Sequence, residues 1–243
     1  MPNQKPHLVS FTIDPIALMS LAAARKTIPP SGDLGYAIHQ VLTETFGKAA
    51  PKPFHLFEEA SCALLAYSCY TPEELIGLAL QQKPNVLGWE LSSAALNFPA
   101  MEGAVLPAPW PRGKRYRFTV RTRPVMRTSH AKERRLPREC DVFLHAVASK
   151  EKEAWLDRQA VYLSWFEKQA ANAGAKIGGV RVTRMTRRQV YRKGAPSLDG
   201  PDVTFTGALE ISDPEAFDDF VMRGVGRHRA FGYGMLLLRT DSP

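Results

Sequence analysis

The chain has 243 residues, a mass of 27.0 kDa and a hydrophobic fraction of 44%, values typical of a globular protein with one large or two smaller domains. No apolar run approaches the ~20 residues that a bilayer-spanning helix needs, no export signal is recognisable, and the three cysteines lack C-x-x-C spacing, so we expect a reduced, cytoplasmic protein without a structural zinc site. The formal net charge of +8 directs attention to anionic partners.

The first half of the chain predicts a β-α-β-β-α-β series, which is the ferredoxin-like order. The expected strands cover residues 7–13, 54–59, 62–70 and 114–124, and the expected helices cover 34–46 and 72–83. Asp33 is the expected N-cap of the first helix and Gly47 its end, while Thr71 and Glu74 form a capping box at the second. Residues 84–111 match no regular element.

The second half repeats this order. The expected strands cover residues 140–147, 178–193, 202–212 and 235–240, and the expected helices cover 150–173 and 213–222. The predicted fold class is therefore α+β, with two ferredoxin-like (βαββαβ) domains in tandem. We place the first domain at residues 1–123, a basic linker at 124–138 and the second domain at 139–243.

Two segments concentrate the positive charge. Residues 112–138 carry eleven Lys or Arg with Glu133 as their only acid, and residues 176–193 carry seven with no acid. A solvated surface usually mixes charges of both signs, so these segments favour binding of a polyanion over a plain charged face.

The strand "RYRFTVRTR" divides its side chains between two faces. Tyr116, Phe118 and Val120 alternate with four arginines: Arg115, Arg117, Arg121 and Arg123. Burying an unpaired guanidinium is costly, so we expect the arginine face to meet solvent or phosphate. The alternative is an edge strand protected by charge, for which one or two arginines would suffice.

A glycine loop, "GVGRHRAFGYG", covers residues 224–234 and leads into the last strand. Glycine lets backbone N–H groups approach an anion closely. A dinucleotide fingerprint is excluded, because Arg229 stands at its third glycine position and no helix follows; there is no G-K-[ST] either. We therefore expect no nucleotide cofactor, and no group of side chains has the spacing of metal ligands.

The predicted helix at 34–46 carries an apolar stripe that includes Ile38 and Val41, with Tyr36 and His39 on the opposite side. From the helical positions alone, His39 is either a plain surface residue or part of a site. The two ferredoxin-like halves, the G-x-G-x5-G-x-G loop and the Y-x-x-H helix together resemble the CRISPR-associated RNA-processing endoribonucleases of the RAMP superfamily. The similarity is to the CasE-like branch of type I-E systems or its type IV counterpart.

This resemblance implies a metal-independent endoribonuclease that cleaves CRISPR repeat hairpins in precursor transcripts and then stays bound to the guide RNA in a class 1 effector complex. It implies that His39 is the general acid or base, with Tyr36 beside it; Arg25 and Lys26 are candidates for phosphate stabilisation. The alternatives are a non-catalytic RNA-binding subunit of the same superfamily and a tandem-fold RNA binder unrelated to CRISPR. The expected RNA-binding residues are Arg115, Arg117, Arg121, Arg123, Arg127, Arg134, Arg135, Arg181, Arg184, Arg187, Arg188, Arg192, Lys193, Gly224, Gly226, Arg227, His228, Arg229, Gly232 and Gly234.

Overall fold

The structure is a computed structural model, which describes residues 5–27, 34–57, 63–82, 89–127, 139–149, 155–190 and 197–241. Two compact units divide the chain. The first comprises residues 1–108, 189–198 and 229–235, and the second comprises residues 109–188, 199–228 and 236–243. Both units therefore contain segments that are far apart in the sequence.

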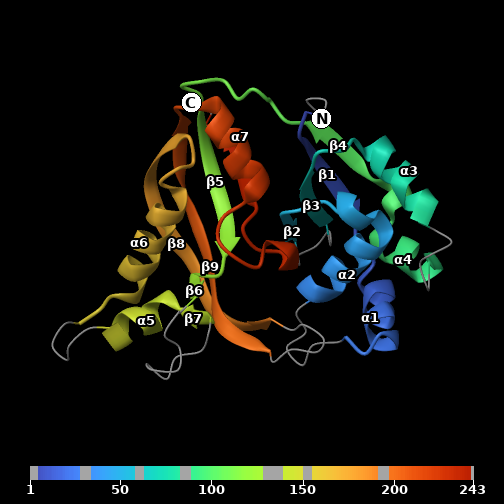
Figure 1. The fold of residues 1–243 in the computed structure, drawn as a ribbon, viewed down its shortest axis with the longest axis horizontal. Coiled ribbons are helices and arrows are strands. Elements are labelled where there is room, and N and C mark those ends of the chain that lie inside the picture. Colours follow the sequence, from blue (N-terminus) through green and yellow to red (C-terminus); the bar gives the residue numbers. More distant parts are fainter. Residues whose placement is uncertain are drawn as a thin grey trace. The chain divides into compact units, whose positions relative to one another are not determined.

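The first unit has an antiparallel sheet with the strand order β2-β3-β1-β4. Its elements are β1 (His7–Thr12), α1 (Pro15–Ala24), α2 (Gly35–Phe46), η1 (Gly47–Ala49), β2 (Phe54–Leu56), β3 (Ala63–Ser68), α3 (Pro72–Gln82), α4 (Trp89–Leu96), η3 (Phe98–Ala100) and β4 (Glu102–Val105). Since β1 lies between β3 and β4, the sheet has the ferredoxin-like arrangement (Figure 1).

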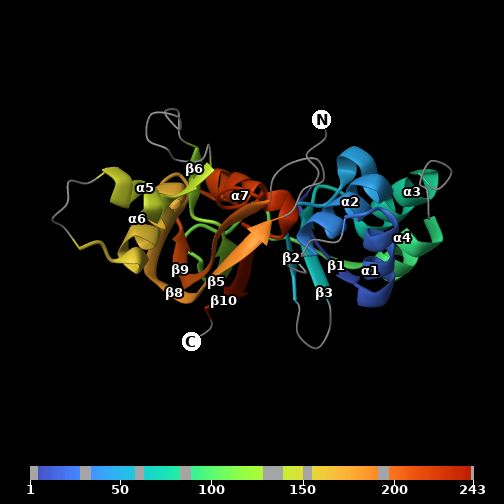
Figure 2. The same cartoon turned by 90° about the horizontal axis from the view of Figure 1, so that it is seen from below.

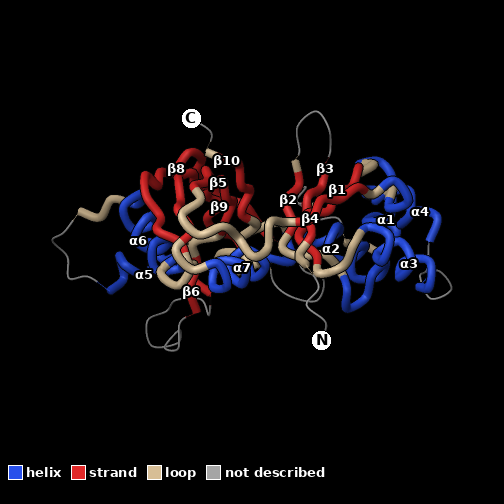
Figure 3. The backbone as a smooth tube through the Cα atoms, turned by 90° about the horizontal axis from the view of Figure 1, so that it is seen from above, coloured by secondary structure: helices blue, strands red, loops and turns tan. Residues whose placement is uncertain are grey.

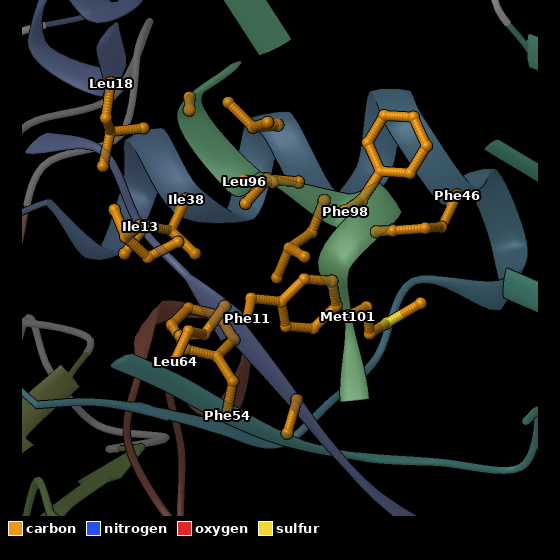
Figure 4. Close-up of a cluster of buried hydrophobic side chains, with 14 of the residues drawn as sticks. Phe11, Ile13, Leu18, Ile38, Phe46, Phe54, Leu64, Leu96, Phe98 and Met101 are labelled. Carbon is orange, nitrogen blue, oxygen red and sulfur yellow. The ribbon is translucent and has the colours of Figure 1, made fainter. Parts of the chain in front are cut away.

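The core of the first unit lies between this sheet and its helices. Phe11 from β1, Leu64 from β3 and Ile38 from α2 are each at most 1% exposed. Figure 4 shows these side chains gathered with Phe46, Phe98 and other apolar residues. The core fixes α2 against the sheet and thereby directs the other side of this helix away from it.

The second unit repeats the arrangement with the strand order β10-β5-β9-β8. Its elements are β5 (Arg115–Thr122), β6 (Val125–Arg127), β7 (Glu139–Asp141), α5 (Val142–Ser149), α6 (Arg158–Ala170), β8 (Ala175–Val190), β9 (Leu198–Ile211), α7 (Pro214–Arg223), η4 (Arg229–Phe231) and β10 (Leu236–Thr240), although η4 and the last residues of β8 belong to the first unit. The helices α6 and α7 lie on one side of the sheet (Figure 3). The long β8 forms the edge beside β9 (Figure 2).

The tandem ferredoxin-like fold class is confirmed, but one strand was assigned to the wrong repeat and another was not predicted. The strand at 115–122 pairs with β9 and β10, so it begins the second repeat rather than closing the first. The first sheet is closed instead by β4, which comes from the stretch where no element was predicted. The division between the two sheets thus precedes β5.

Three further expectations were wrong in detail. Residues 142–149 form the helix α5, where a strand was expected, and α1 was not predicted at all. Residues 125–127 pair with residues 139–141 inside the second unit, so both ends of the stretch expected to be a linker lie in this unit. Its residues 128–138 lie outside the described part.

Several local helix signals were read correctly, but the N-cap of α2 is Leu34, without a side-chain hydrogen bond, where Asp33 was expected. The Thr71 N–H donates to Glu74 Oε2 (2.8 Å) and the Glu74 N–H donates to Thr71 Oγ1 (3.2 Å), which is the predicted capping box. Gly47 ends α2 with φ = 58°, and Asp213 caps α7. Among the described helices, none combines the length and the apolar character that a membrane crossing requires.

Candidate active site

The helix α2 presents two polar aromatic residues on one side. Tyr36 and His39 are three positions apart, so they occupy neighbouring sites on the helix surface, and their ring centroids are 6.4 Å apart. Ile38, Val41 and Leu42 are almost completely buried in the core. Tyr36 and His39 therefore lie together apart from the apolar stripe, as the sequence predicted, and both are half-buried.

The end of the glycine loop packs against these two residues. Phe231, in η4, lies 5.3 Å from the His39 ring with the planes at 88°, and 6.0 Å from the Tyr36 ring. All of these residues belong to the first unit. The structure thus joins the Y-x-x-H helix and the glycine loop, two motifs that are far apart in the sequence, although Phe231 itself was not predicted to take part.

The surroundings of His39 favour its neutral form. Partial burial, together with the positive charge of Lys52, holds the pKa of the imidazole below its ordinary value of 6.5. The Nδ1 atom of the imidazole lies 3.4 Å from the hydroxyl oxygen of Thr43, one turn further along α2. Such a histidine is neutral at physiological pH and able to accept a proton.

Arg25 and Lys26, the other candidates, lie at the end of α1. The Arg25 guanidinium is 2.6 Å from the Glu44 carboxylate and donates to the Ser92 hydroxyl at 3.4 Å. Burial raises the pKa of the Glu44 carboxyl, although the charge of Arg25 opposes this shift. Lys26 is exposed with φ = 54°.

The first part of the glycine loop belongs to the second unit. Gly224 ends α7 with φ = 72°, and Gly226, with φ = 75°, packs tightly against Trp165, because an added Cβ would lie 3.0 Å from its ring. The next two residues bind one acid: Arg227 Nε is 2.8 Å and His228 Nε2 is 2.5 Å from the Glu139 carboxylate. These basic side chains were expected to contact RNA but are engaged within the protein.

Glu139 is held in its ionised form by these contacts. Burial alone would raise the pKa of its carboxyl, but the hydrogen bonds and charges of His228 and Arg227 outweigh burial and lower it. Because Glu139 begins β7, the pair of contacts fixes the glycine loop to the β6–β7 hairpin.

Acids from distant parts of the chain neutralise several arginines of the two basic segments. Arg117 binds Asp241 at 2.7 Å, and Arg187 binds Asp199 at 2.6 Å. Asp202, which is 1% exposed, accepts two hydrogen bonds from Arg121 and lies 3.7 Å from Arg188. Counting charge by segment could not reveal these partners, because the acids lie in other segments.

Arg123 corrects the expectation that all four arginines of this strand meet solvent or phosphate. It is 1% exposed and donates from Nη1 to the Arg188 carbonyl at 2.9 Å. The strand β5 ends at Thr122, so the alternation no longer directs the next side chain outward. Gly200 packs closely against this side chain, since an added Cβ there would lie 2.6 Å from Arg123 Nη2.

The expected RNA-binding arginines that remain exposed are fewer. Arg115, Arg127 and Arg184 are exposed and make no ion pair with any described residue. Arg181 is also exposed and donates from Nε to the Thr206 hydroxyl at 3.3 Å. Arg134, Arg135, Arg192 and Lys193 lie outside the described residues. In the part of the chain that the structure describes, no three His, Cys, Asp or Glu side chains gather as metal ligands would.

Comparison with known proteins identifies relatives over almost the whole chain. Residues 11–240 match the model of a family described as CRISPR associated protein. Among solved structures, Cse3 of Thermus thermophilus, bound to an RNA representing a pre-cleavage complex, is 19% identical with a TM-score of 0.60, and the match covers 97% of this chain and 99% of that one. No curated protein sequence matches the chain.

Two further structures have the same fold. Cas6e of Escherichia coli K-12 is 20% identical with a TM-score of 0.56, over 96% of this chain and 99% of that one. A chain of a CRISPR RNA-guided surveillance complex is 16% identical with a TM-score of 0.55 over the same shares. At these identities the likeness establishes the tandem ferredoxin-like fold.

Proposed function

Because the chain belongs to the family of CRISPR associated proteins, we propose that it is an endoribonuclease that cleaves the repeat hairpins of CRISPR precursor transcripts into guide RNAs. The observation that carries the proposal is the meeting of Tyr36, His39 and Phe231, which brings the Y-x-x-H helix and the glycine loop to one place. Two structures with this fold are, by their descriptions, an endoribonuclease bound to RNA and a subunit of an RNA-guided complex.

The proposed reaction uses the ribose 2′-hydroxyl as its nucleophile. The 2′-oxygen attacks the adjacent phosphorus as its proton leaves, the bond from phosphorus to the 5′-oxygen breaks, and that oxygen gains a proton. The products are a 2′,3′-cyclic phosphate and a 5′-hydroxyl. Such a reaction needs a base, an acid and positive charge beside the phosphorane, all of which side chains can supply without a metal ion.

His39 is the proposed acid–base residue. Its lowered pKa makes it neutral near pH 7, which suits a base that takes the proton of the 2′-hydroxyl. Tyr36 lies beside it as a hydrogen-bonding group. Of the two candidate cations at the end of α1, Lys26 is the better source of positive charge, because Arg25 already binds Glu44 and Ser92.

The proposed RNA surface uses the exposed arginines. Arg115, Arg127, Arg181 and Arg184 can each approach a phosphate, whereas Arg117, Arg121, Arg187 and Arg188 bind acids of the chain. Contacts to phosphate and to A-form shape are the usual means of recognising an RNA duplex. After cleavage we expect the product to stay bound and to join an effector complex.

Cleavage of a labelled repeat hairpin in excess EDTA tests the proposal. We expect the hairpin to be cut, and the upstream product to end in a 2′,3′-cyclic or 3′-phosphate. Strict dependence on Mg²⁺, or products with 3′-hydroxyl and 5′-phosphate ends, would show a different chemistry. Tight hairpin binding without cleavage would favour the second candidate function, a non-catalytic RNA-binding subunit.

A further inference from the structure

Phe231 is the residue of the glycine loop that contacts the proposed catalytic pair. Its ring meets His39 edge-on and also lies 6.0 Å from the Tyr36 ring. Both contacts fall within the 4.5–7 Å between centroids at which aromatic rings attract one another, and the perpendicular arrangement with His39 is a favoured one. A single ring thus limits the movement of both side chains of α2.

The backbone around Phe231 leaves it little freedom. Gly232 has φ = 84°, and an added Cβ would lie 3.2 Å from the ring of Phe54 in β2. Gly234 has φ = 81°, and the residues on either side of it, Tyr233 and Met235, are each 1% exposed. A conformation of this kind is available to glycine and strained for other residues. These features restrict the backbone that places Phe231 beside α2.

We infer that Phe231 is a positioning residue, which holds the imidazole of His39 in the orientation needed for proton transfer. The inference rests on the proposed function and assigns a second role to the glycine loop, besides any contact with RNA. Thr43 also contacts the imidazole, since its hydroxyl lies 3.4 Å from Nδ1. A proton transfer between fixed groups depends steeply on such alignment.

Titratable groups on the neighbouring elements affect the pKa of His39, and they have to be considered before a titration is interpreted. Lys52, between η1 and β2, lowers the pKa of the imidazole, and Arg229 lies in η4 two residues before Phe231. The other titratable groups on α2 itself are Tyr36 and Glu44, and the Glu44 carboxylate forms an ion pair with Arg25. Removing the Phe231 ring changes none of these charges but exposes the imidazole to water, so the pKa of His39 should rise toward its ordinary value.

The test compares Phe231→Ala and Phe231→Leu with the wild-type chain. The histidine C–H resonances are titrated by NMR in the RNA-free protein, with His39 assigned through His39→Ala, and single-turnover cleavage and hairpin affinity are measured in parallel. For Phe231→Ala we expect a raised His39 pKa and a cleavage rate about 10- to 100-fold lower, with unchanged hairpin affinity. Phe231→Leu, which keeps the bulk, should recover part of both.

Phe57→Ala is the matched control, because the Phe57 ring makes the same kind of edge-on contact with another histidine, His55, at 4.7 Å and 72°. It should change neither the His39 titration nor the rate. An unchanged His39 titration in Phe231→Ala would overturn the inference, as would a wild-type cleavage rate. If the wild-type chain does not cut RNA, the proposed function fails, and the titration still decides whether Phe231 holds the imidazole.

Discussion

Arg121 donates two hydrogen bonds to the carboxylate of Asp202, from Nε at 2.9 Å and from Nη2 at 2.7 Å, with the acid 1% exposed. This pair joins β5 to β9 at a point where the sequence suggested an arginine directed at RNA. A bidentate pair of this kind is specific in geometry and strong in hydrogen bonding. It makes Arg121 part of the internal structure of the second unit.

Substitution of Asp202 should therefore damage stability. We expect Asp202→Ala to lower the free energy of unfolding by about 3–5 kcal/mol, because the largely buried Arg121 guanidinium loses two hydrogen bonds to this carboxylate. Asp199→Ala is the control, since Asp199 and Arg187 are about half exposed, and its cost should stay below about 1 kcal/mol. Urea denaturation measures both values, and equal losses would contradict our account of the buried pair.

Substitution of an exposed arginine should weaken RNA binding without loss of stability. For Arg184→Gln we expect lower affinity for repeat hairpins and a salt dependence flattened by about 0.7–0.9 in the log–log slope for one lost phosphate contact. Lys168→Gln is the control: this exposed lysine in the last turn of α6 lies outside both basic segments, so its removal should leave affinity nearly unchanged. Equal effects of the two variants would mean that binding depends on net charge alone.

Removal of the His39 imidazole should slow cleavage and spare binding. Loss of a general acid or base typically costs ~100- to 10,000-fold in rate, and we expect His39→Ala to fall in this range. Hairpin affinity, measured separately, should remain close to that of the wild type. Cleavage at the wild-type rate would move the catalytic assignment to Lys26 or to an arginine.

The pH dependence of cleavage should follow the lowered pKa of His39. A base is active once it is deprotonated, so the rate should rise with pH through a midpoint below 6.5. Lys52→Met removes a positive charge that disfavours the imidazolium, so the pKa should increase and the rising limb should move to higher pH. A limb that stays in place in this variant would show that another group controls the rate.

Local signals in the sequence predicted much of the fold. The Asp213-Pro214 start of α7, the capping box at Thr71 and the glycine end of α2 each depend on neighbouring residues, and all three are present. The helix α1 has the same kind of start, because the Asp14 side chain accepts from two N–H groups of its first turn. It was missed because its sequence, "PIALMSLAAA", is apolar on nearly all sides and shows no helical stripe.

Non-local choices could not be predicted in the same way. Nothing within β5 specifies that its neighbours are β9 and β10 instead of a strand of the first unit, since pairing depends on residues elsewhere in the chain. The short apolar run that forms α5 fits a strand or a buried helix equally well. The site shows the same limit: the sequence pointed to Tyr36 and His39, while Phe231 and Lys52 became visible only through the fold.

The contact between His39 and Phe231 has a consequence for the timing of synthesis. A ribosome adds about 5–20 residues per second, so Phe231 is made on the order of 10 seconds or more after His39. During this interval α2 can form, but the ring that covers the imidazole does not yet exist. A nascent chain would therefore carry the proposed catalytic pair without its positioning ring until the glycine loop emerges, and we expect slower cleavage of a transcript that met it earlier.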